Sequence, residues 1–276
     1  MAISPCPNDT FIFDALINSK IDTEGFEFET VLDDIQRLNE LARRKEMDLI
    51  KVSAGVIPFI WEDYFILPSG GAMGYGVGPL LITRPERKLT EPSGNNTTIA
   101  LPGFNTTAHF LFSMAYPSAV NKKFISFADI EEEVGNGLAD YGVIIHENRF
   151  TYQQKGLHLV KDLGTYWQEQ TGSPIPLGVI AAKRTLPLNI LHTLNRLIRK
   201  SLEYAEATSL PDLPQFVCMH AQEMSTEVMR EHIRLYVNAF SRDMGEQGKH
   251  AIFQMLKIQG ETLDHPQKIP EDLFLP

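Results

Sequence analysis

The sequence has few cysteines and no long apolar run. Only two of its 276 residues are cysteines, Cys6 and Cys218, which are too few for a disulfide-rich secreted scaffold or a zinc site built from cysteine pairs. No stretch of about 20 apolar residues occurs, so the sequence predicts no membrane span. The first ten residues do not join a basic segment to an apolar one, so we expect no signal peptide and a cytoplasmic protein.

Positive charge is also scarce. The chain has 25 Lys and Arg against 35 Asp and Glu, which gives a formal net charge of −10. Binding of nucleic acid without sequence preference, or of an anionic membrane surface, needs a positive patch, so we expect neither partner. An acidic chain can still bind a small anion where the N-terminus of a helix creates a local positive site.

Short β-type runs alternate with helical patterns along the chain. The β-type runs are 26–31, 49–52, 80–83, 98–101, 143–145 and 177–181. Apolar residues at helical spacing mark 34–45, 188–206, 225–240 and 245–258, and Ser126 with Asp129 has the pattern of a helix start. This alternation predicts an α/β fold with mostly parallel sheets flanked by helices.

Two segments have the same local pattern. Residues 35–53 and 130–146 each contain a helical stretch, a short turn with an Asp, and an apolar strand that ends in polar residues. The similarity is too short to be called a sequence repeat. It favours two similarly built lobes, the second inserted into the first, with a ligand cleft between them.

The lobe boundaries follow from turn-forming residues. The densest glycine stretch is 70–79, and a second cluster of Pro, Gly and Asn lies at 91–96. These clusters predict that the chain crosses between lobes within 83–97 and returns near 171–176. The predicted parts are 1–90 for the first lobe, 91–175 for the inserted second lobe, and 176–276 for the return to the first.

Polar residues follow four of the predicted strands. Ligands of open α/β sheets bind beyond the carboxyl ends of the strands, so these residues are candidates for a site. Asn8 and Asp9 follow the first short strand, where they could contact a ligand or cap a helix that starts at Phe11. The other strand ends carry Ser53, the turn 103–108 and His146.

The turn 103–108 has the sequence GFNTTA and opens a predicted helix. Free N–H groups at a helix start can hold a carboxylate or a phosphate, and Thr106 and Thr107 can add hydroxyl donors. Alternatively, one threonine simply caps the helix. Both interpretations stay open. A phosphate-binding P-loop is excluded because no Gly-Lys-Ser/Thr occurs here.

Three further residues carry chemistry in their side chains. His146 ends an apolar strand, and an imidazole with an ordinary pKa is a good general base, although a lone histidine is more often structural. Lys51 lies two residues before Ser53, so both side chains face the same way, unless Lys51 simply pairs with a carboxylate. Cys6 has no His or Lys nearby in sequence, which disfavours a nucleophilic role.

The sequence contains no metal-binding or nucleotide-binding motif that we recognise. It has no His-x-x-x-His or Glu-x-x-His, and the glycines at 74–78 lack the dinucleotide-binding spacing. We expect His109 to lie behind the threonine pair, and His232 to lie at the surface or in helix packing. The residues alone therefore predict a two-lobed α/β protein that binds a small anion and has a histidine available as a base.

Six segments carry a resemblance to a known family. They are SPCPNDTF at 4–11, GAMGYGVGPLL at 71–81, GFNTTA at 103–108, GVIIHENRFTY at 142–152, TGSPIPLG at 171–178 and HIRLYVNAFSRDMGEQGKHAI at 232–252. In this order they resemble the 1,4-dihydroxy-6-naphthoate synthases of the futalosine route to menaquinone. That family is related to the chorismate dehydratases of the same route and has the fold of type II periplasmic binding proteins.

The resemblance implies an activity and a set of site residues. Members convert cyclic dehypoxanthine futalosine to 1,4-dihydroxy-6-naphthoate as carbon–carbon lyase-type enzymes, without a metal or a redox cofactor. His146 matches the expected general base, which would abstract a proton before elimination. The expected substrate-binding residues, which would hold a small carboxylate substrate, are Lys51, Ser53, Thr106, Thr107, Ala108, Asn8 and Asp9.

Two alternative functions remain. A non-catalytic protein that binds a small anion could share the fold, but it should carry an export signal and would not need His146 in the cleft. A chorismate dehydratase is the second alternative, and the opening motif SPCPNDTF disfavours it.

Overall fold

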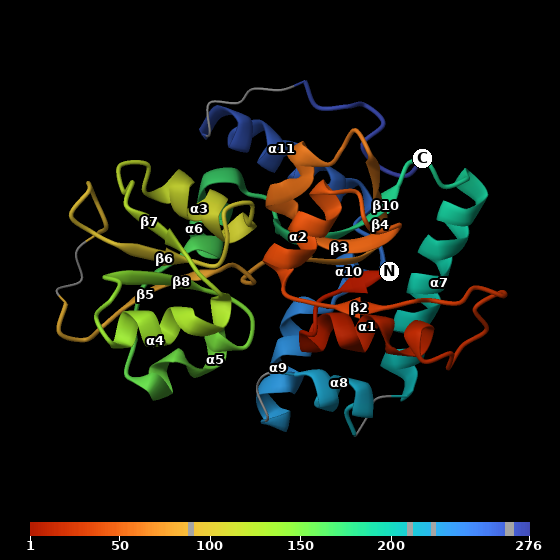
Figure 1. The fold of residues 1–276 in the computed structure, drawn as a ribbon, viewed down its shortest axis with the longest axis horizontal. Coiled ribbons are helices and arrows are strands. Elements are labelled where there is room, and N and C mark those ends of the chain that lie inside the picture. The colour runs from red at the N-terminus through yellow and green to blue at the C-terminus, as the bar shows by residue number, and fades with distance from the viewer. Residues whose placement is uncertain (88–90, 209–211, 222–224, 263–267) are drawn as a thin grey trace.

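Two five-stranded sheets, each flanked by helices, form the two lobes of the protein in a computed structural model (Figure 1). The structure describes residues 1–87, 91–208, 212–221, 225–262 and 268–276. The strand orders are β2-β1-β3-β10-β4 in the first sheet and β7-β6-β8-β5-β9 in the second. Both chain ends lie in the lobe of the first sheet, on the right of Figure 1.

The first lobe contains the N-terminal and C-terminal parts of the chain. Its strands are β1 (Ala2–Ile3), β2 (Val31–Leu32), β3 (Leu49–Ser53), β4 (Tyr64–Gly74) and β10 (Ile175–Lys183). Its helices are α1 (Pro7–Ile17), α2 (Ile35–Arg43), the 3₁₀ helix η1 (Ala54–Phe59), α7 (Leu188–Thr208), α8 (Gln215–His220), α9 (Thr226–Tyr236), α10 (Ala239–Arg242) and α11 (Gly245–Thr262).

The second lobe is made by the middle of the chain. Its strands are β5 (Leu80–Thr83), β6 (Ile99–Leu101), β7 (Lys122–Phe124), β8 (Tyr141–Ile144) and β9 (His158–Asp162). Its helices are α3 (Thr107–Ala115), η2 (Phe127–Asp129), α4 (Ile130–Gly135), α5 (Asn148–Thr151), η3 (Tyr152–Lys155) and α6 (Leu163–Thr171).

The two lobes share one topology. The succession β1-α1-β2-α2-β3 in the first lobe corresponds to β6-α3-β7-α4-β8 in the second, with the same strand order and directions. The two segments of similar local pattern are therefore α2-β3 and α4-β8. The α/β two-lobed fold is confirmed. The sheets are mixed rather than mostly parallel, because the strands joined to the lobe crossings run antiparallel to their neighbours.

One strand lies in a different lobe from the one expected. The predicted first lobe includes the run 80–83, but this run forms β5, which pairs with β8 and β9 of the second sheet. The chain thus leaves the first sheet after Gly74, earlier than the predicted interval 83–97. Residues 88–90, at the predicted boundary, lie outside the described residues. The chain re-enters the first sheet with β10, which begins at Ile175, and the lobe boundaries themselves stay a prediction.

The glycine-rich stretch explains this difference. It continues β4 rather than ending it, because its small residues allow β4 and β10 to approach closely. A Cβ on Gly70, where φ is +84°, would lie 2.7 Å from Ile180, and one on Gly71 would lie 3.0 Å from the Gly178 oxygen. Glycine inside a strand commonly marks such an approach or a bulge, and the β10–β4 register shifts here.

The start of helix α1 determines where Asn8 and Asp9 lie. Helix α1 begins at Pro7 rather than near Phe11, because a proline fits the first helical position and Cys6 is the N-cap. Asn8 and Asp9 therefore lie in the first turn of α1, and neither caps it.

The predicted strand 26–31 is also wrong: only Val31–Leu32 pairs as a strand.

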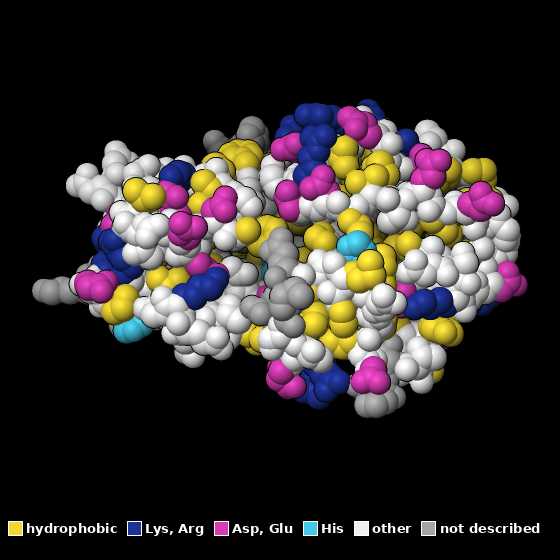
Figure 2. Space-filling view, turned by 60° about the horizontal axis from the view of Figure 1, so that its bottom comes forward, with side chains coloured by type: hydrophobic (Ala, Val, Ile, Leu, Met, Phe, Trp, Pro, Cys, Tyr) yellow, Lys and Arg dark blue, Asp and Glu magenta, His cyan; other side chains and the backbone are white. Residues whose placement is uncertain are grey.

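The surface has charges of both signs. On the face in Figure 2, basic and acidic side chains lie side by side in several places. Ion pairs such as Arg234–Glu231 and Lys200–Glu24 are examples of this mixing. Within the described ranges, no helix combines the length and the apolar character that crossing a membrane requires.

Candidate active site

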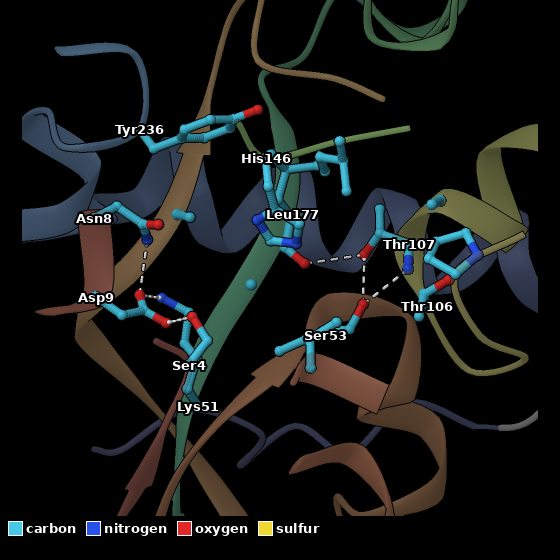
Figure 3. Close-up of a pocket in the computed structure, with 16 residues that line it drawn as sticks. Ser4, Asn8, Asp9, Lys51, Ser53, Thr106, Thr107, His146, Leu177 and Tyr236 are labelled. Atoms are coloured by element: carbon cyan, nitrogen blue, oxygen red, sulfur yellow. Dashed lines mark hydrogen bonds and ion pairs between the residues drawn. The ribbon is translucent and has the colours of Figure 1, made fainter. Parts of the chain in front are cut away.

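A cavity between the lobes is lined by 16 residues from both of them (Figure 3). Most residues of the first lobe come from β3, α1, β10 and the end of α9, and those of the second lobe follow β6 and β8. All eight residues predicted for the site line this cavity: Asn8, Asp9, Lys51, Ser53, Thr106, Thr107, Ala108 and His146.

Thr107 connects the second lobe to the first across the cavity. Its backbone N–H donates to Ser53 Oγ at 2.8 Å, and its hydroxyl lies 3.0 Å from the same oxygen (Figure 3). That hydroxyl also donates to the Leu177 carbonyl and accepts from the Gly55 N–H. The start of α3 is therefore joined to β3, η1 and β10 by hydrogen bonds.

Gly55 allows this close approach of the lobes. A Cβ at this position would lie 2.7 Å from the carbonyl carbon of Thr106 and 2.9 Å from the nitrogen of Thr107. Both atoms belong to the backbone, which cannot rotate away as a side chain can. The two threonines thus differ in role: Thr106 caps α3 by accepting from the His109 N–H, while Thr107 bonds across the lobes.

A buried ion pair lies at the other side of the cavity. Lys51 Nζ donates to Asp9 Oδ1 at 2.6 Å and to the Gly70 carbonyl at 3.0 Å. Asp9 also accepts from Ser4 Oγ and Asn8 Nδ2 (Figure 3). Lys51 is thus paired with a carboxylate and also lines the cavity, and the two opposite charges largely cancel there.

His146 follows β8 in an unusual backbone conformation. Its φ is +64°, in the left-handed region, where residues other than glycine are uncommon and where functional strain tends to occur. Its ring lies 5.3 Å from that of Phe127 and 6.2 Å from that of His232, which is nearly parallel to it.

The surroundings of His146 favour its neutral form. Desolvation lowers the pKa of His146 to about 4, Asp9 opposes this shift and Lys51 adds to it. The imidazole is therefore unprotonated near neutral pH and can accept a proton. Its Nδ1 lies 3.4 Å from Cys6 Sγ.

Two residues of helix α9 belong to the site although sequence reasoning assigned them to packing or the surface. Tyr236 lines the cavity, and burial raises the pKa of its hydroxyl. His232 is fully buried, and its Nε2 lies 2.8 Å from Asn8 Oδ1. The positions 232 and 236 share a helix face, and their rings lie 4.6 Å apart. The four-residue spacing of His232 and Tyr236, in a segment that resembles the family, is the feature of the sequence that could have identified them as site residues.

Other residues lie where sequence spacing could not place them. Cys6 is 140 residues from His146 in the chain but next to it in the structure.

His109 lies behind the threonine pair, as expected: its Nδ1 contacts the Phe104 carbonyl and its Nε2 faces Lys122. Desolvation lowers the pKa of His109 to about 4.

Solved structures define the class of fold. Protein AF1704 from Archaeoglobus fulgidus superposes with a TM-score of 0.86 at 28% identity, covering 95% of this chain and 97% of that one. The aliphatic sulphonate binding protein SsuA from Escherichia coli superposes with a TM-score of 0.62 at 11% identity, covering 95% and 84%. The protein therefore has the two-lobed fold of periplasmic binding proteins.

The sequence identifies the family. Residues 1–261 match the menaquinone biosynthesis family, so the chain belongs to that family. It is 40% identical over 275 residues to the 1,4-dihydroxy-6-naphthoate synthase of Thermus thermophilus, covering 100% of this chain and 98% of the relative. It is also 40% identical over 261 residues to the enzyme of that name from Streptomyces coelicolor, covering 93% and 90%.

Proposed function

We propose that this protein is a lyase that converts cyclic dehypoxanthine futalosine to 1,4-dihydroxy-6-naphthoate in menaquinone biosynthesis, and that it acts in the cytoplasm. Its membership of the menaquinone biosynthesis family supports this, as do relatives of that name at 40% identity along nearly the whole chain. The observation that carries the proposal is the position of His146 in a cavity between the lobes that the start of α3 also lines.

His146 is the general base of the proposed reaction. It removes a proton from carbon in the bound substrate, and the electrons of that C–H bond expel a leaving oxygen of the sugar-derived ring. Ring opening follows, the C–C bond to the remaining sugar-derived carbons breaks so that they leave as a separate product, and formation of the aromatic naphthoate drives the reaction forward. Burial lowers the pKa of His146, so its ring is unprotonated near neutral pH, and general base catalysis contributes about 10²- to 10⁴-fold to the rate.

The substrate carboxylate binds at the start of α3. The N–H groups of Thr107 and Ala108 lie in the first turn of this nine-residue helix, where the helix dipole favours an anion. A carboxylate oxygen takes the place that Ser53 Oγ occupies beside the Thr107 N–H, and the Ser53 hydroxyl then donates to it. Lys51 adds little net attraction, because Asp9 neutralises it.

Closure of the lobes around the substrate protects the reaction. Removal of a proton from carbon leaves a carbanion-like intermediate, which water would quench. The bonds from the Thr107 hydroxyl to Gly55 and Leu177 hold the lobes together on one side of the cavity. Tyr236 and Leu177 cover part of the remaining wall.

Incubation with two possible substrates tests the proposal. The purified chain is mixed separately with cyclic dehypoxanthine futalosine and with chorismate, and naphthoate absorbance and loss of chorismate are followed. We expect naphthoate from the first mixture only. Turnover of chorismate alone would assign the protein to the dehydratases, and tight binding without turnover of either compound would make it a solute-binding protein.

A further inference from the structure

Three potential metal ligands meet at His146. Cys6 and Glu147 are nearly buried, with 5% and 4% of their surface exposed, and neither lines the cavity. The sulfur of Cys6, a ring nitrogen of His146 and a carboxylate oxygen of Glu147 all lie within 4.8 Å of one another. Among the described residues, no other group of three Cys, His or acidic residues brings its ligand atoms within this distance.

The spacing suits a tetrahedral zinc ion. Zinc bonds of about 2.3 Å to sulfur and 2.0 Å to nitrogen hold these two atoms roughly 3.6 Å apart at the tetrahedral angle. Cys6 Sγ and His146 Nδ1 are 3.4 Å apart without any ion. The Glu147 carboxylate oxygen lies within 4.8 Å of both atoms, so it would move by at most about 1 Å to share a tetrahedral centre with them.

The ligand types also suit zinc. A thiolate and a carboxylate together balance the charge of a divalent ion, so the complex itself carries no net charge in a buried place. A thiolate is a soft ligand that favours zinc over magnesium or calcium. Three protein ligands leave one coordination position for water, as in zinc sites that are not purely structural.

We propose that Cys6, His146 and Glu147 bind Zn²⁺ and that the bound ion inhibits the enzyme. The thiol proton of Cys6 passes to the buffer as the sulfur–zinc bond forms, and nothing is oxidised or reduced. The ion occupies His146 Nδ1 and leaves the proton of the neutral ring on Nε2, so neither nitrogen can accept a proton from substrate. Binding is independent of the proposed function, whereas inhibition rests on it.

Cobalt reports on the binding directly. Co²⁺ is added to the full-length protein, and a thiolate-to-cobalt absorption in the near ultraviolet is followed and then displaced with Zn²⁺. We expect the absorption in the wild type and in Cys218→Ala, which removes the exposed cysteine, but not in Cys6→Ala. No absorption in the wild type, or an absorption that persists in Cys6→Ala, overturns the proposal.

A second variant keeps the test decisive if Cys6→Ala fails to fold. Glu147→Gln preserves the shape of the side chain and removes its charge, so the affinity for Co²⁺ should fall by at least about tenfold. Equal affinity of Glu147→Gln and wild type overturns the assignment of Glu147 as a ligand. Mg²⁺ at the same concentrations should leave the cobalt absorption unchanged.

Activity measurements test the inhibition separately. Naphthoate formation in the wild type and in Cys218→Ala should fall at the Zn²⁺ concentrations that displace cobalt, and a chelator should restore it. Cys6→Ala should retain its own metal-free activity at those concentrations. Zinc binding without inhibition overturns the inhibitory role. A protein that binds cobalt but never makes naphthoate contradicts the proposed function and supports the metal site.

Discussion

Replacing Lys51 by Met should strongly destabilise the protein, because it leaves the buried Asp9 carboxylate without its counter-charge. The side chains of Lys51 and Asp9 are 4% and 1% exposed, and their charged atoms are 2.6 Å apart. In Lys51→Met, Asp9 keeps only the neutral donors of Ser4 and Asn8. Removal of one partner from such a pair costs about 3–5 kcal/mol in the free energy of unfolding.

The double variant separates the lost charge from the lost packing. Lys51→Met combined with Asp9→Asn removes both charges, and replacement of a whole buried pair is often nearly neutral. The double variant should therefore be more stable than Lys51→Met by about 2 kcal/mol or more. Lys200→Met is the surface control, since Lys200 and Glu24 are 43% and 33% exposed and such pairs contribute less than about 1 kcal/mol.

Urea unfolding followed by tryptophan fluorescence measures these differences. Trp61 and Trp167 are both buried, so their emission changes when the chain unfolds. A loss in Lys51→Met no larger than that in Lys200→Met would refute the reasoning. So would a double variant that is as unstable as the sum of its two single variants.

Three further predictions concern the histidines and the contact between the lobes. Folding lowers the pKa values of His109, His146 and His232, whereas an unfolded histidine binds a proton near pH 6.5. Below pH 6.5, each of these histidines should therefore lower the free energy of unfolding by up to about 1.4 kcal/mol per pH unit. Equal urea midpoints at pH 7 and pH 5 would contradict this. Gly55→Ala should lower kcat/KM by about 10²-fold, because the added Cβ pushes the lobes apart. The control Gly135→Ala places its Cβ in open space and should leave kcat/KM unchanged. Equal kcat/KM values for the two variants would refute this reasoning. Thr107→Val should cost about 1–3 kcal/mol and raise KM, because the Gly55 N–H and the Leu177 carbonyl lose the Thr107 hydroxyl, whereas Thr107→Ser keeps both bonds. Equal urea midpoints and KM values for the two variants would count against the assignment.

Local patterns predicted most of the architecture. Strand runs and helical spacing were sufficient for the α/β class, and the similar segments 35–53 and 130–146 correspond to equivalent parts of the two lobes. The membership of β5 in the second sheet could not be predicted this way. Pairing between strands depends on contacts far apart in sequence, and the glycines before β5 serve a close approach of β4 to β10 rather than a turn.

The site was predictable where it follows strand ends. The rule that ligands bind beyond the carboxyl ends of strands selects Ser53, Thr107 and His146, and all three line the cavity. Tyr236 and His232 were missed because they come from a C-terminal helix that returns to the first lobe. The contact between Cys6 and His146 was missed because it joins the first helix of one lobe to a strand end of the other.

The most direct test of the account replaces His146 by Asn. Asparagine tolerates the left-handed backbone at this position, so His146→Asn removes the imidazole with little added strain. We measure turnover of cyclic dehypoxanthine futalosine by naphthoate absorbance and substrate binding by calorimetry. The account predicts that kcat falls by about 10²- to 10⁴-fold while binding persists. A kcat equal to that of the wild type would contradict it.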